Sequence, residues 1–237
     1  MLPRVLEPET LDHLAPDDPV AQRSRRDLRR VNAFMGARAI LARAMARASP
    51  DTSRPLRILE LGCGDGRLML EVARHRGTRW PGARLDLLDR QPLVDEATRA
   101  DYRAAGWQAV PLVADVMAWA ESADGDRWDL IVANLFLHHF DAETLRRLLA
   151  ACARRADALA ACEPRRSRFA LAASHLIFFL GANAVTRNDG VLSVRAGFIG
   201  DELAVAWPAE RADWRLEEYD DGLFTHCLVA ARRLSAP

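Results

Sequence analysis

The residues best suited to chemistry form a short acidic and glycine-rich segment, ELGCGDG, at residues 60–66. Glycines at alternating positions let the backbone turn tightly and let a ligand approach without meeting a Cβ atom. The acidic Glu60 at the head of the segment suits a cationic cofactor better than a pyrophosphate. A dinucleotide-binding loop would also require a small residue where this sequence has Arg67. The segment therefore predicts a site for a cofactor other than a dinucleotide.

Further polar residues stand where three later apolar runs end. Asp89 closes the run ARLDLLD, Asp115 lies near the end of AVPLVADV, and Asn134 lies late in WDLIVANLFL. A carboxylate at the position of Asp89 can accept hydrogen bonds from both hydroxyls of a ribose. The alternative is that Asp89 is the N-cap of a helix. Because the carboxyl ends of parallel strands open onto one crevice, we expect these residues to share a site with the glycine-rich segment.

The elements that must position these residues alternate between strands and helices. We expect strands over residues 56–62, 83–89, 109–116, 128–137 and 157–164, and helices over 65–77, 93–106 and 141–156. Residues 214–233 contain two β-like runs around residues 220–222, which predict a closing hairpin. The fold class is therefore α/β, with a doubly wound, mostly parallel sheet of seven strands.

The flanking segments are helical in pattern. Residues 18–48 predict one or two amphipathic helices. The arginines at 23–30 are interpreted as a solvated face that Asp27 partly pairs, and the alternative is a basic patch. Residues 49–55 are a linker by their serine and proline content. We expect an N-terminal helical cap and linker over 1–55 and a Rossmann-like domain over 56–237. A helical insertion over 165–213, after the fifth strand, is expected to cap the substrate.

Between residues 56 and 164 the sequence resembles the class I S-adenosylmethionine-dependent methyltransferases. ELGCGDG matches the family's ExGxGxG motif, Asp89 its ribose-binding acid, and residues 114–116 its adenine-edge motif. DLIVANLFLHHF matches the strand-four motif, and residues 162–164 match the fifth strand. The LHH signature is similar to that of the ubiquinone and menaquinone methyltransferase branch.

The resemblance implies that S-adenosylmethionine is the cofactor. It implies that Glu60, Gly62 and Gly64 hold the methionyl part, while Asp115 and Val116 hold the adenine. The candidate cofactor-binding residues are Glu60, Gly62, Cys63, Gly64, Gly66, Asp89, Arg90, Asp115, Val116, Asn134 and Leu135.

Three histidines are candidates for a general base, which is needed when the methyl acceptor is a hydroxyl. His138 and His139 follow the fourth strand, at the rim where acceptors lie in this fold, and one of them is expected to face the pocket. His175 lies in the uncharged stretch of the insertion, residues 169–186. For each histidine the alternative is a structural role. If the apolar run LIFFL at 176–180 roofs the pocket, the acceptor should be apolar or aromatic.

Composition limits the partners. The chain has 33 basic and 33 acidic side chains, a balance that argues against a nucleic-acid partner. Its four cysteines and its adjacent histidines lack metal-ligand spacing, so no metal site is expected. The acidic, proline-broken N-terminus does not resemble a signal peptide, and the uncharged stretch favours a buried helix over a membrane span. We therefore expect a cytoplasmic protein without stable membrane insertion; a homodimer remains open.

The sequence thus predicts S-adenosylmethionine-dependent methylation of a small aromatic or lipophilic acceptor, with O-methylation of a phenol, quinol or natural-product intermediate favoured. One alternative is C-methylation of a quinone-type ring. Alternatives of another class are a non-catalytic cofactor-binding protein and an NAD(P)-dependent oxidoreductase.

Overall fold

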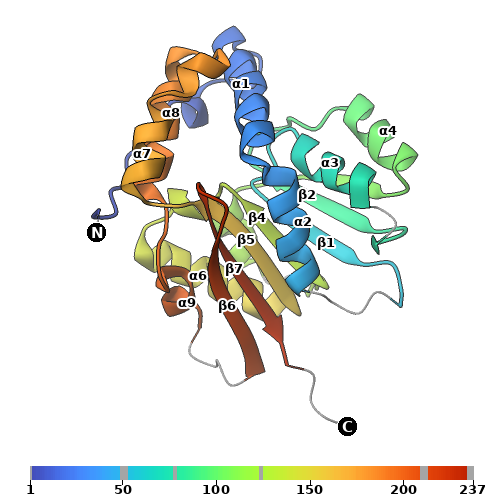
Figure 1. Ribbon diagram of the computed structural model, residues 1–237. Helices are drawn as coiled ribbons and strands as arrows, with labels where there is room; N and C mark the ends of the chain where they lie inside the picture. Colours follow the sequence, from blue (N-terminus) through green and yellow to red (C-terminus); the bar gives the residue numbers. More distant parts are fainter. Residues whose placement is uncertain (1, 49–52, 77–78, 123–124, 209–212, 234–237) are drawn as a thin grey trace.

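A computed structural model describes residues 2–48, 53–76, 79–122, 125–208 and 213–233 (Figure 1). The strands are β1 (Arg57–Leu61), β2 (Arg84–Asp89), β3 (Gln108–Val113), β4 (Leu130–Asn134), β5 (Ala158–Pro164), β6 (Trp214–Asp221) and β7 (Thr225–Arg232). The α-helices are α1 (Pro19–Met35), α2 (Ala37–Ala48), α3 (Arg67–Arg76), α4 (Glu96–Ala104), α5 (Val116–Glu121), α6 (Ala142–Arg155), α7 (Arg168–Ser174), α8 (Ala184–Ala196) and α9 (Glu202–Ala206). Short 3-10 helices are η1 (Leu11–His13), η3 (Leu137–His139) and η4 (Ile177–Leu180).

The strands form one sheet in the order β3-β2-β1-β4-β5-β7-β6. Strands β1 to β5 run parallel, while β7 pairs antiparallel with both β5 and β6. The predicted seven-stranded, mostly parallel sheet and its closing hairpin are confirmed. Because the strand order reverses between β1 and β4, the crevice in which such sheets bind ligands lies at the carboxyl ends of these two strands.

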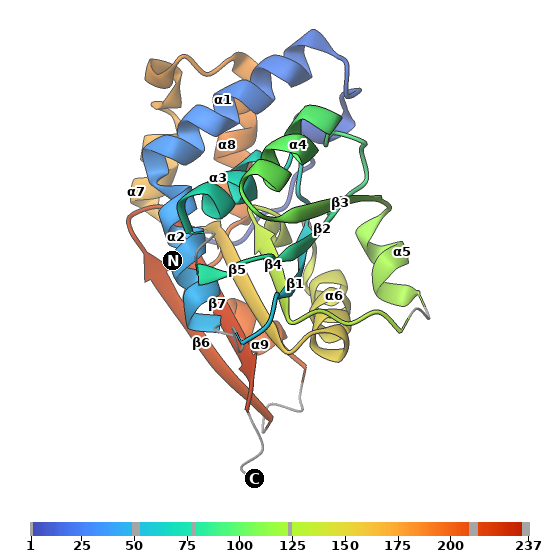
Figure 2. The ribbon, with the colours of Figure 1, turned by 90° about the vertical axis from the view of Figure 1, so that its right-hand side faces the viewer.

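Helices cover both faces of the sheet (Figure 2). On one face α2, α3 and α4 bury side chains such as Met45 and Tyr102, and on the other α5, α6 and α9 bury Leu148 and Leu203. Helix α2 therefore belongs to the core of the domain. The sequence predicts a cap over 1–55 and a domain over 56–237. The structure differs from this division, because α2 packs within the domain core while the segment before α2 lies over the edge of the sheet.

Helix α1 and the insertion meet above the carboxyl end of the sheet, as Figure 1 shows. Asp27 of α1 is buried and accepts a hydrogen bond from the Asn183 backbone N–H at 2.9 Å. The side-chain amide of Asn183 donates to the hydroxyl of Ser24 at 2.9 Å. These polar contacts fix the rotation of α1 about its axis. Within the predicted insertion, residues 209–212 lie outside the described part of the chain, as do residues 49–52 of the predicted linker.

Two strands end earlier than the sequence predicts. Strand β3 stops at Val113, and Asp115 is the N-cap of α5, where its carboxylate accepts the N–H groups of Met117 and Ala118. An N-cap residue has an extended backbone like that of a strand, so the apolar pattern did not distinguish the N-cap Asp115 from the last residue of the strand. Strand β4 stops at Asn134, because Leu135 turns into the left-handed region with a φ of 51°.

The uncharged stretch 169–186 is divided among α7, η4 and the start of α8. No helix in the described ranges combines the length and apolar character that crossing a bilayer requires. The side chains of Phe169 and Leu176 are 58% and 55% exposed. The expectation of a buried helix is wrong for these residues: Phe169 lies outside the buried face of α7, which is formed by Ala170 and Ser174, and Leu176 follows the end of that helix.

Candidate active site

The glycine-rich loop joins β1 to α3 at the mouth of the crevice. Gly62, Gly64 and Gly66 have φ angles of 63°, 54° and 69°, which residues with a Cβ atom rarely adopt. A Cβ atom at Gly62 would also lie 2.1 Å from the ring of Phe136. The loop therefore needs glycine for its turns and for the close approach of a side chain that follows β4. Cys63 between them is half-buried, and burial raises the pKa of its thiol, so it is a neutral small residue here.

Glu60 is a buried acid with an unused oxygen. It is 4% exposed, and its Oε2 atom has no hydrogen-bond partner among the described residues. Burial, reinforced by the charges of Asp65 and Asp89, raises the pKa of Glu60 to about 8. Leaving a buried polar atom unpaired costs free energy, so the native structure is expected to use it. A cationic group such as an ammonium fits this position, which agrees with the cofactor that the sequence predicts.

Asp89 is the last residue of β2 and supports the loop directly. Its Oδ2 accepts a hydrogen bond from the Gly64 N–H, and its Oδ1 accepts one from the Gln91 N–H, both at 2.9 Å. The alternative that Asp89 is a helix N-cap is wrong, because α4 begins later and is capped by Asp95. Each carboxylate oxygen has a second lone pair that remains available to a ribose hydroxyl.

Across the crevice the chain leaves β4 in a strained conformation. Leu135 is the single non-glycine residue with a positive φ angle among the residues described. Such a conformation costs on the order of 1–3 kcal/mol and is concentrated at functional sites. It is stabilised by a 2.9 Å hydrogen bond from the Leu135 N–H to the Cys162 carbonyl. The turn places half-buried Asn134 at the crevice and directs the next residues into η3.

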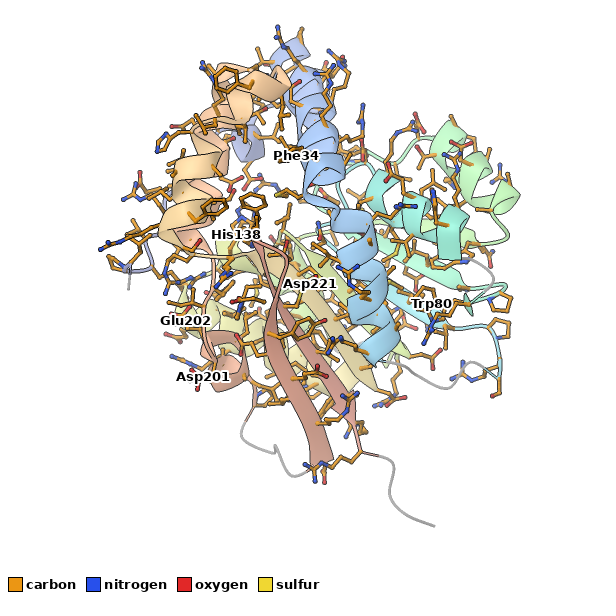
Figure 3. The ribbon with its side chains drawn as sticks, in the orientation of Figure 1. Phe34, Trp80, His138, Asp201, Glu202 and Asp221 are labelled. Carbon is orange, nitrogen blue, oxygen red and sulfur yellow. The ribbon has the colours of Figure 1, made fainter. Side chains whose placement is uncertain are left out.

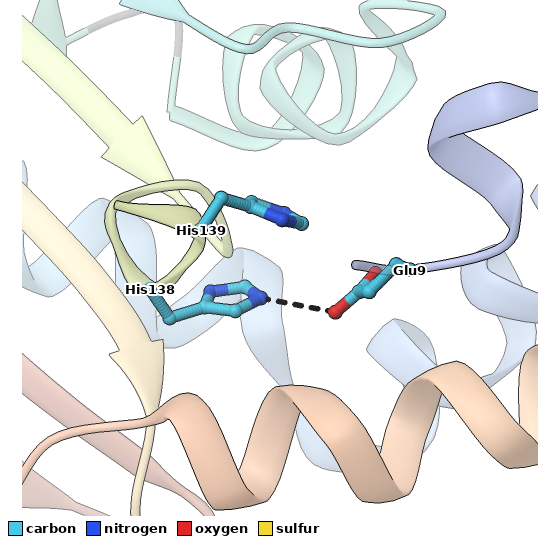
Figure 4. Close-up of side chains that lie close together, drawn as sticks. All are labelled: Glu9, His138 and His139. Carbon is cyan, nitrogen blue, oxygen red and sulfur yellow. Dashed lines mark hydrogen bonds and ion pairs between the residues drawn. The ribbon is translucent and has the colours of Figure 1, made fainter. Parts of the chain in front are cut away.

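His138 and His139, on η3, face an acid from the N-terminal segment (Figure 4). His138 is 2% exposed; its Nδ1 contacts Glu163 of β5 at 2.8 Å and its Nε2 contacts Glu9 at 3.3 Å. Burial opposes the charged ring, but the hydrogen bonds to Glu163 and Glu9 outweigh it and raise the pKa of His138 to about 9. His138 is therefore an imidazolium at neutral pH, with both nitrogens engaged.

His139 differs from its neighbour although the two rings stack with centroids 4.2 Å apart. Its side chain is 24% exposed, and its Nδ1 lies 3.4 Å from Asp12 of η1. Burial and the adjacent His138 charge lower the pKa of His139. A neutral imidazole at neutral pH can accept a proton, which the engaged His138 cannot.

Glu163 anchors this arrangement. It is fully buried and accepts hydrogen bonds from the N–H groups of Phe136, Leu137 and His138, at 3.1, 2.8 and 3.3 Å. The carboxylate thereby holds the whole turn after β4 in place. Glu163 lies in a predicted strand motif but was not among the candidate site residues.

The N-terminal segment, residues 2–18, lies along the crevice. Glu9 also accepts a hydrogen bond from Ser193 of α8, and Asp189 of α8 accepts the N–H groups of Thr10 and Leu11. Arg90, which follows Asp89, donates to the Asp12 carbonyl. Glu9 and Asp12 were missed in the sequence, where they stand as isolated acids more than 120 residues from the histidines that they contact.

His175, the third predicted base, lies apart from this cluster. It is exposed at the end of α7. Val116 is buried as the first residue of α5, and Asp115 is exposed. The structure therefore brings together the loop, Asp89, Asn134 and the histidine pair, while His175 lies at the exposed end of α7.

Glu9, His138 and His139 meet a distance condition for a metal ion, since one potential ligand atom from each lies within 4.8 Å of the others. The ring nitrogens already have acidic partners: Nδ1 and Nε2 of His138 contact Glu163 and Glu9, and Nδ1 of His139 lies 3.4 Å from Asp12. The arrangement is better suited to hydrogen bonding and proton transfer than to coordination.

Comparison with known proteins relates the strand–helix part of the chain to methyltransferases. A family model described as a methyltransferase domain matches residues 58–157. Trans-aconitate 2-methyltransferase of Rhodococcus jostii (strain RHA1) is 36% identical over 87 residues, a match that spans 37% of this chain and 29% of that relative.

Solved structures extend the likeness over nearly the whole chain. The plantazolicin methyltransferase BpumL in complex with SAH matches with a TM-score of 0.66 and 14% identity, covering 92% of each chain. An O-methyltransferase family protein from Burkholderia thailandensis matches with a TM-score of 0.55 and 19% identity, covering 92% of this chain and 63% of that one. Residues 58–157 thus match a methyltransferase domain, and the chain has the fold of the class I, S-adenosylmethionine-dependent methyltransferases.

Proposed function

We propose that this protein transfers a methyl group from S-adenosylmethionine to a small aromatic or lipophilic acceptor, with a hydroxyl oxygen as the favoured nucleophile. The observation that carries the cofactor assignment is the unpaired, buried carboxyl of Glu60 beside three left-handed glycines. The methyltransferase family match supports methyl transfer over the alternative of a nicotinamide-dependent oxidoreductase.

When bound, S-adenosylmethionine supplies a methyl group activated by a sulfonium. The protein's task is then mainly to align the nucleophile, and such positioning can contribute about 7–11 kcal/mol. Glu60 and the glycine loop hold the methionyl part, Asp89 holds the ribose, and the residues that follow β3 and β4 lie toward the adenine and the acceptor. Asp115 retains one carboxylate oxygen beyond the one that caps α5.

His139 is the proposed general base. Its neutral ring is the member of the pair that can take the proton of an acceptor hydroxyl as the new bond to oxygen forms. His138, fixed by Glu163 and Glu9, supports the stacked ring and keeps it neutral through its own positive charge. His175, also selected from the sequence, is exposed on α7 and is a second candidate base that the same experiments test.

The acceptor class follows from side chains around the crevice. Phe34, at the end of α1, is 68% exposed and lies between α1 and the insertion in Figure 3. Phe169 and Leu176 of the insertion are also largely exposed. An exposed apolar surface of this kind favours a partly apolar acceptor. Two of the matched proteins support O-methylation: the Burkholderia protein by its family name and, more weakly, the trans-aconitate enzyme, whose acceptor is a small acid.

Calorimetric titration of metal-stripped protein with S-adenosylmethionine and its demethylated product tests the cofactor assignment. We expect saturable binding of both. No heat and no competition at millimolar cofactor would overturn the proposal.

Transfer of a labelled methyl group to an acceptor panel then tests the substrate class. Phenols and quinols are the expected acceptors, while a quinone-type ring methylated at carbon supports the alternative reaction. Trans-aconitate belongs in the panel as a polar comparison. Preference for it over every phenol would contradict the apolar acceptor.

A further inference from the structure

A hollow of about 520 Å³ lies between α5 and α6, which pack side by side in Figure 2. Arg154 and Arg155, at the end of α6, line one part of it, and Asp126 and Arg127, which precede β4, line another. The hollow therefore lies near the amino ends of β4 and β5. The crevice described above lies at the carboxyl ends of the strands, so the two sites are separate.

Arginine dominates the charged lining of this hollow. Four arginines face two acids there: Arg127, Arg147, Arg154 and Arg155 against Glu121 and Asp126. Both acids are already paired, Glu121 with Arg147 and Asp126 with Arg57 of β1. Arg127 pairs with Asp157. Within the described ranges, Arg154 and Arg155 have no acidic partner, so two positive charges are left over.

Arg155 is the buried member of the four, with only 7% of its surface exposed. Its Nη2 donates to the backbone carbonyl of Ser122 and, at 3.0 Å, to the hydroxyl of the same residue. Its guanidinium lies 4–6 Å from the ring of Trp119, at 5.0 Å from the centroid. Its Nη1 has no hydrogen-bond partner among the residues described. A buried cation with an unpaired donor costs free energy, which an anionic acceptor would relieve.

A purely structural role accounts for part of this arrangement. Cations in the last turn of a helix interact favourably with its dipole, and Arg127 donates to the Arg154 carbonyl at 3.0 Å. The helix end does not explain why a buried guanidinium lines a hollow with one nitrogen unpaired. A ligand that is both anionic and rich in acceptor oxygens explains both features.

We propose that this hollow binds a phosphate group, free or carried by a small molecule, through Arg154 and Arg155. A phosphate monoester carries about −1.5 to −2 charges at neutral pH, which matches the two unpaired guanidinium groups. Guanidinium donors also fit phosphate oxygens in pairs. The hollow is larger than one phosphate group, and Met117, Ala120 and Ala150 give it apolar surface for the rest of a small molecule. The proposal does not depend on the methyl transfer proposed above.

Calorimetric titration at fixed ionic strength in chloride tests the site with butyl phosphate, inorganic phosphate and butanol. We expect saturable binding of butyl phosphate and no binding of butanol. Arg155→Gln should weaken butyl phosphate binding more than tenfold, because charge-assisted hydrogen bonds are lost. Arg154→Gln should weaken it by about threefold or more, since Arg154 is exposed. Arg146→Gln is the matched control: Arg146 is exposed on the same helix and does not line the hollow, so the affinity should change less than twofold.

Inorganic phosphate distinguishes the two sources of the ligand. Binding as tight as that of butyl phosphate supports the site with free phosphate as its occupant, and weaker binding supports it with a phosphate ester. No saturable binding of either phosphate overturns the inference.

Two further results would also overturn it. A loss in Arg146→Gln as large as that in Arg155→Gln would show only general attraction to a basic surface. Displacement of butyl phosphate by saturating S-adenosylmethionine would place the phosphate in the crevice. If Arg155→Gln does not fold, Arg154→Gln decides, because unchanged affinity in that variant contradicts the proposal.

Discussion

The two sides of the crevice differ in how their buried ionisable side chains are paired. On the cofactor side, Glu60 is buried with an unpaired oxygen, and neighbouring acids make its ionisation harder. On the acceptor side, the buried His138 is paired at both nitrogens, by Glu163 and by Glu9. The first arrangement is incomplete without a cationic ligand, whereas the second is complete within the protein.

This difference distinguishes a group that binds a ligand, Glu60, from a group that positions its neighbours, His138. An unpaired buried carboxyl raises the free energy of the ligand-free protein and is relieved when a cation binds. A fully paired histidine gains nothing from a ligand but holds its neighbours rigidly. In the proposed reaction His139, whose ring lies 4.2 Å from that of His138, is the residue that this pairing would position toward the acceptor.

The largest expected effect is on turnover. His139→Ala should lower kcat on a phenolic acceptor by roughly a hundredfold, because a positioned base contributes about 10²–10⁴. The affinity for S-adenosylmethionine should remain within twofold. His75→Ala, an exposed histidine on α3, is the control. In the wild-type enzyme kcat/KM should fall as the pH drops below the lowered pKa of His139, and the variant should lose this dependence.

If His139→Ala keeps full activity while His175→Ala loses it, the base lies on the insertion and the role given to the stacked pair is wrong. Full activity in both variants would leave alignment alone as the source of the rate.

A smaller effect is expected on cofactor binding. Asp89→Ala should weaken binding more than tenfold, since a hydrogen bond to a charged group contributes about 1.5–3 kcal/mol. The loss should be smaller for an analogue that lacks one ribose hydroxyl, which separates a ribose contact from support of the loop through Gly64. Asp95→Ala, which removes the N-cap of α4, should lower stability by about 1 kcal/mol without changing the affinity. Equal losses for both ligands would mean that Asp89 acts only on the loop.

The cofactor side was predictable from the sequence because its residues belong to consecutive strand–helix units. The glycines, Glu60 and Asp89 lie at strand ends, and the parallel sheet brings those ends together. Asp115 marks the limit of this reasoning: an extended residue before a helix was assigned to the strand, and it is the N-cap.

The acceptor side was predictable only in part. The position of the histidines after β4 was evident, but their protonation depends on Glu9, which is 129 residues away in the chain from His138. No periodic pattern marks such an acid, because the N-terminal segment that carries it has little regular structure. The arginines of α1 were taken for a solvated face for the same reason: their partners Gln91 and Asp65 lie on other elements.

His138, paired with Glu163 and Glu9, should stabilise the folded protein in a defined pH range. The folded-state pKa of His138, about 9, lies above its unfolded value of about 6.5. Its contribution is therefore complete below pH 6.5 and is lost as the pH rises through 9. The wild-type Tm should fall over this interval by about 2–4 °C for each kcal/mol lost, and His138→Gln should reduce the fall. His226 also titrates, because Glu218 and Asp220 raise its pKa, so the difference between the two proteins is the relevant quantity. Parallel Tm profiles would contradict the assignment.

The smallest expected effect is the number of protons that Glu60 releases when the cofactor binds. With a pKa of about 8, Glu60 is mostly protonated at pH 7 in the ligand-free protein. An ammonium placed beside it favours the carboxylate and lowers that pKa, so binding of S-adenosylmethionine at pH 7 should release up to about one proton. Titrations in buffers of different ionisation enthalpy measure this number. The release should decline at pH 9, where Glu60 is already ionised, and Glu60→Gln should abolish it. If the wild-type protein releases no more protons at pH 7 than the variant, the cofactor's cation does not approach Glu60. The contrast between the unpaired Glu60 and the paired His138 would then no longer explain where this protein binds its ligand.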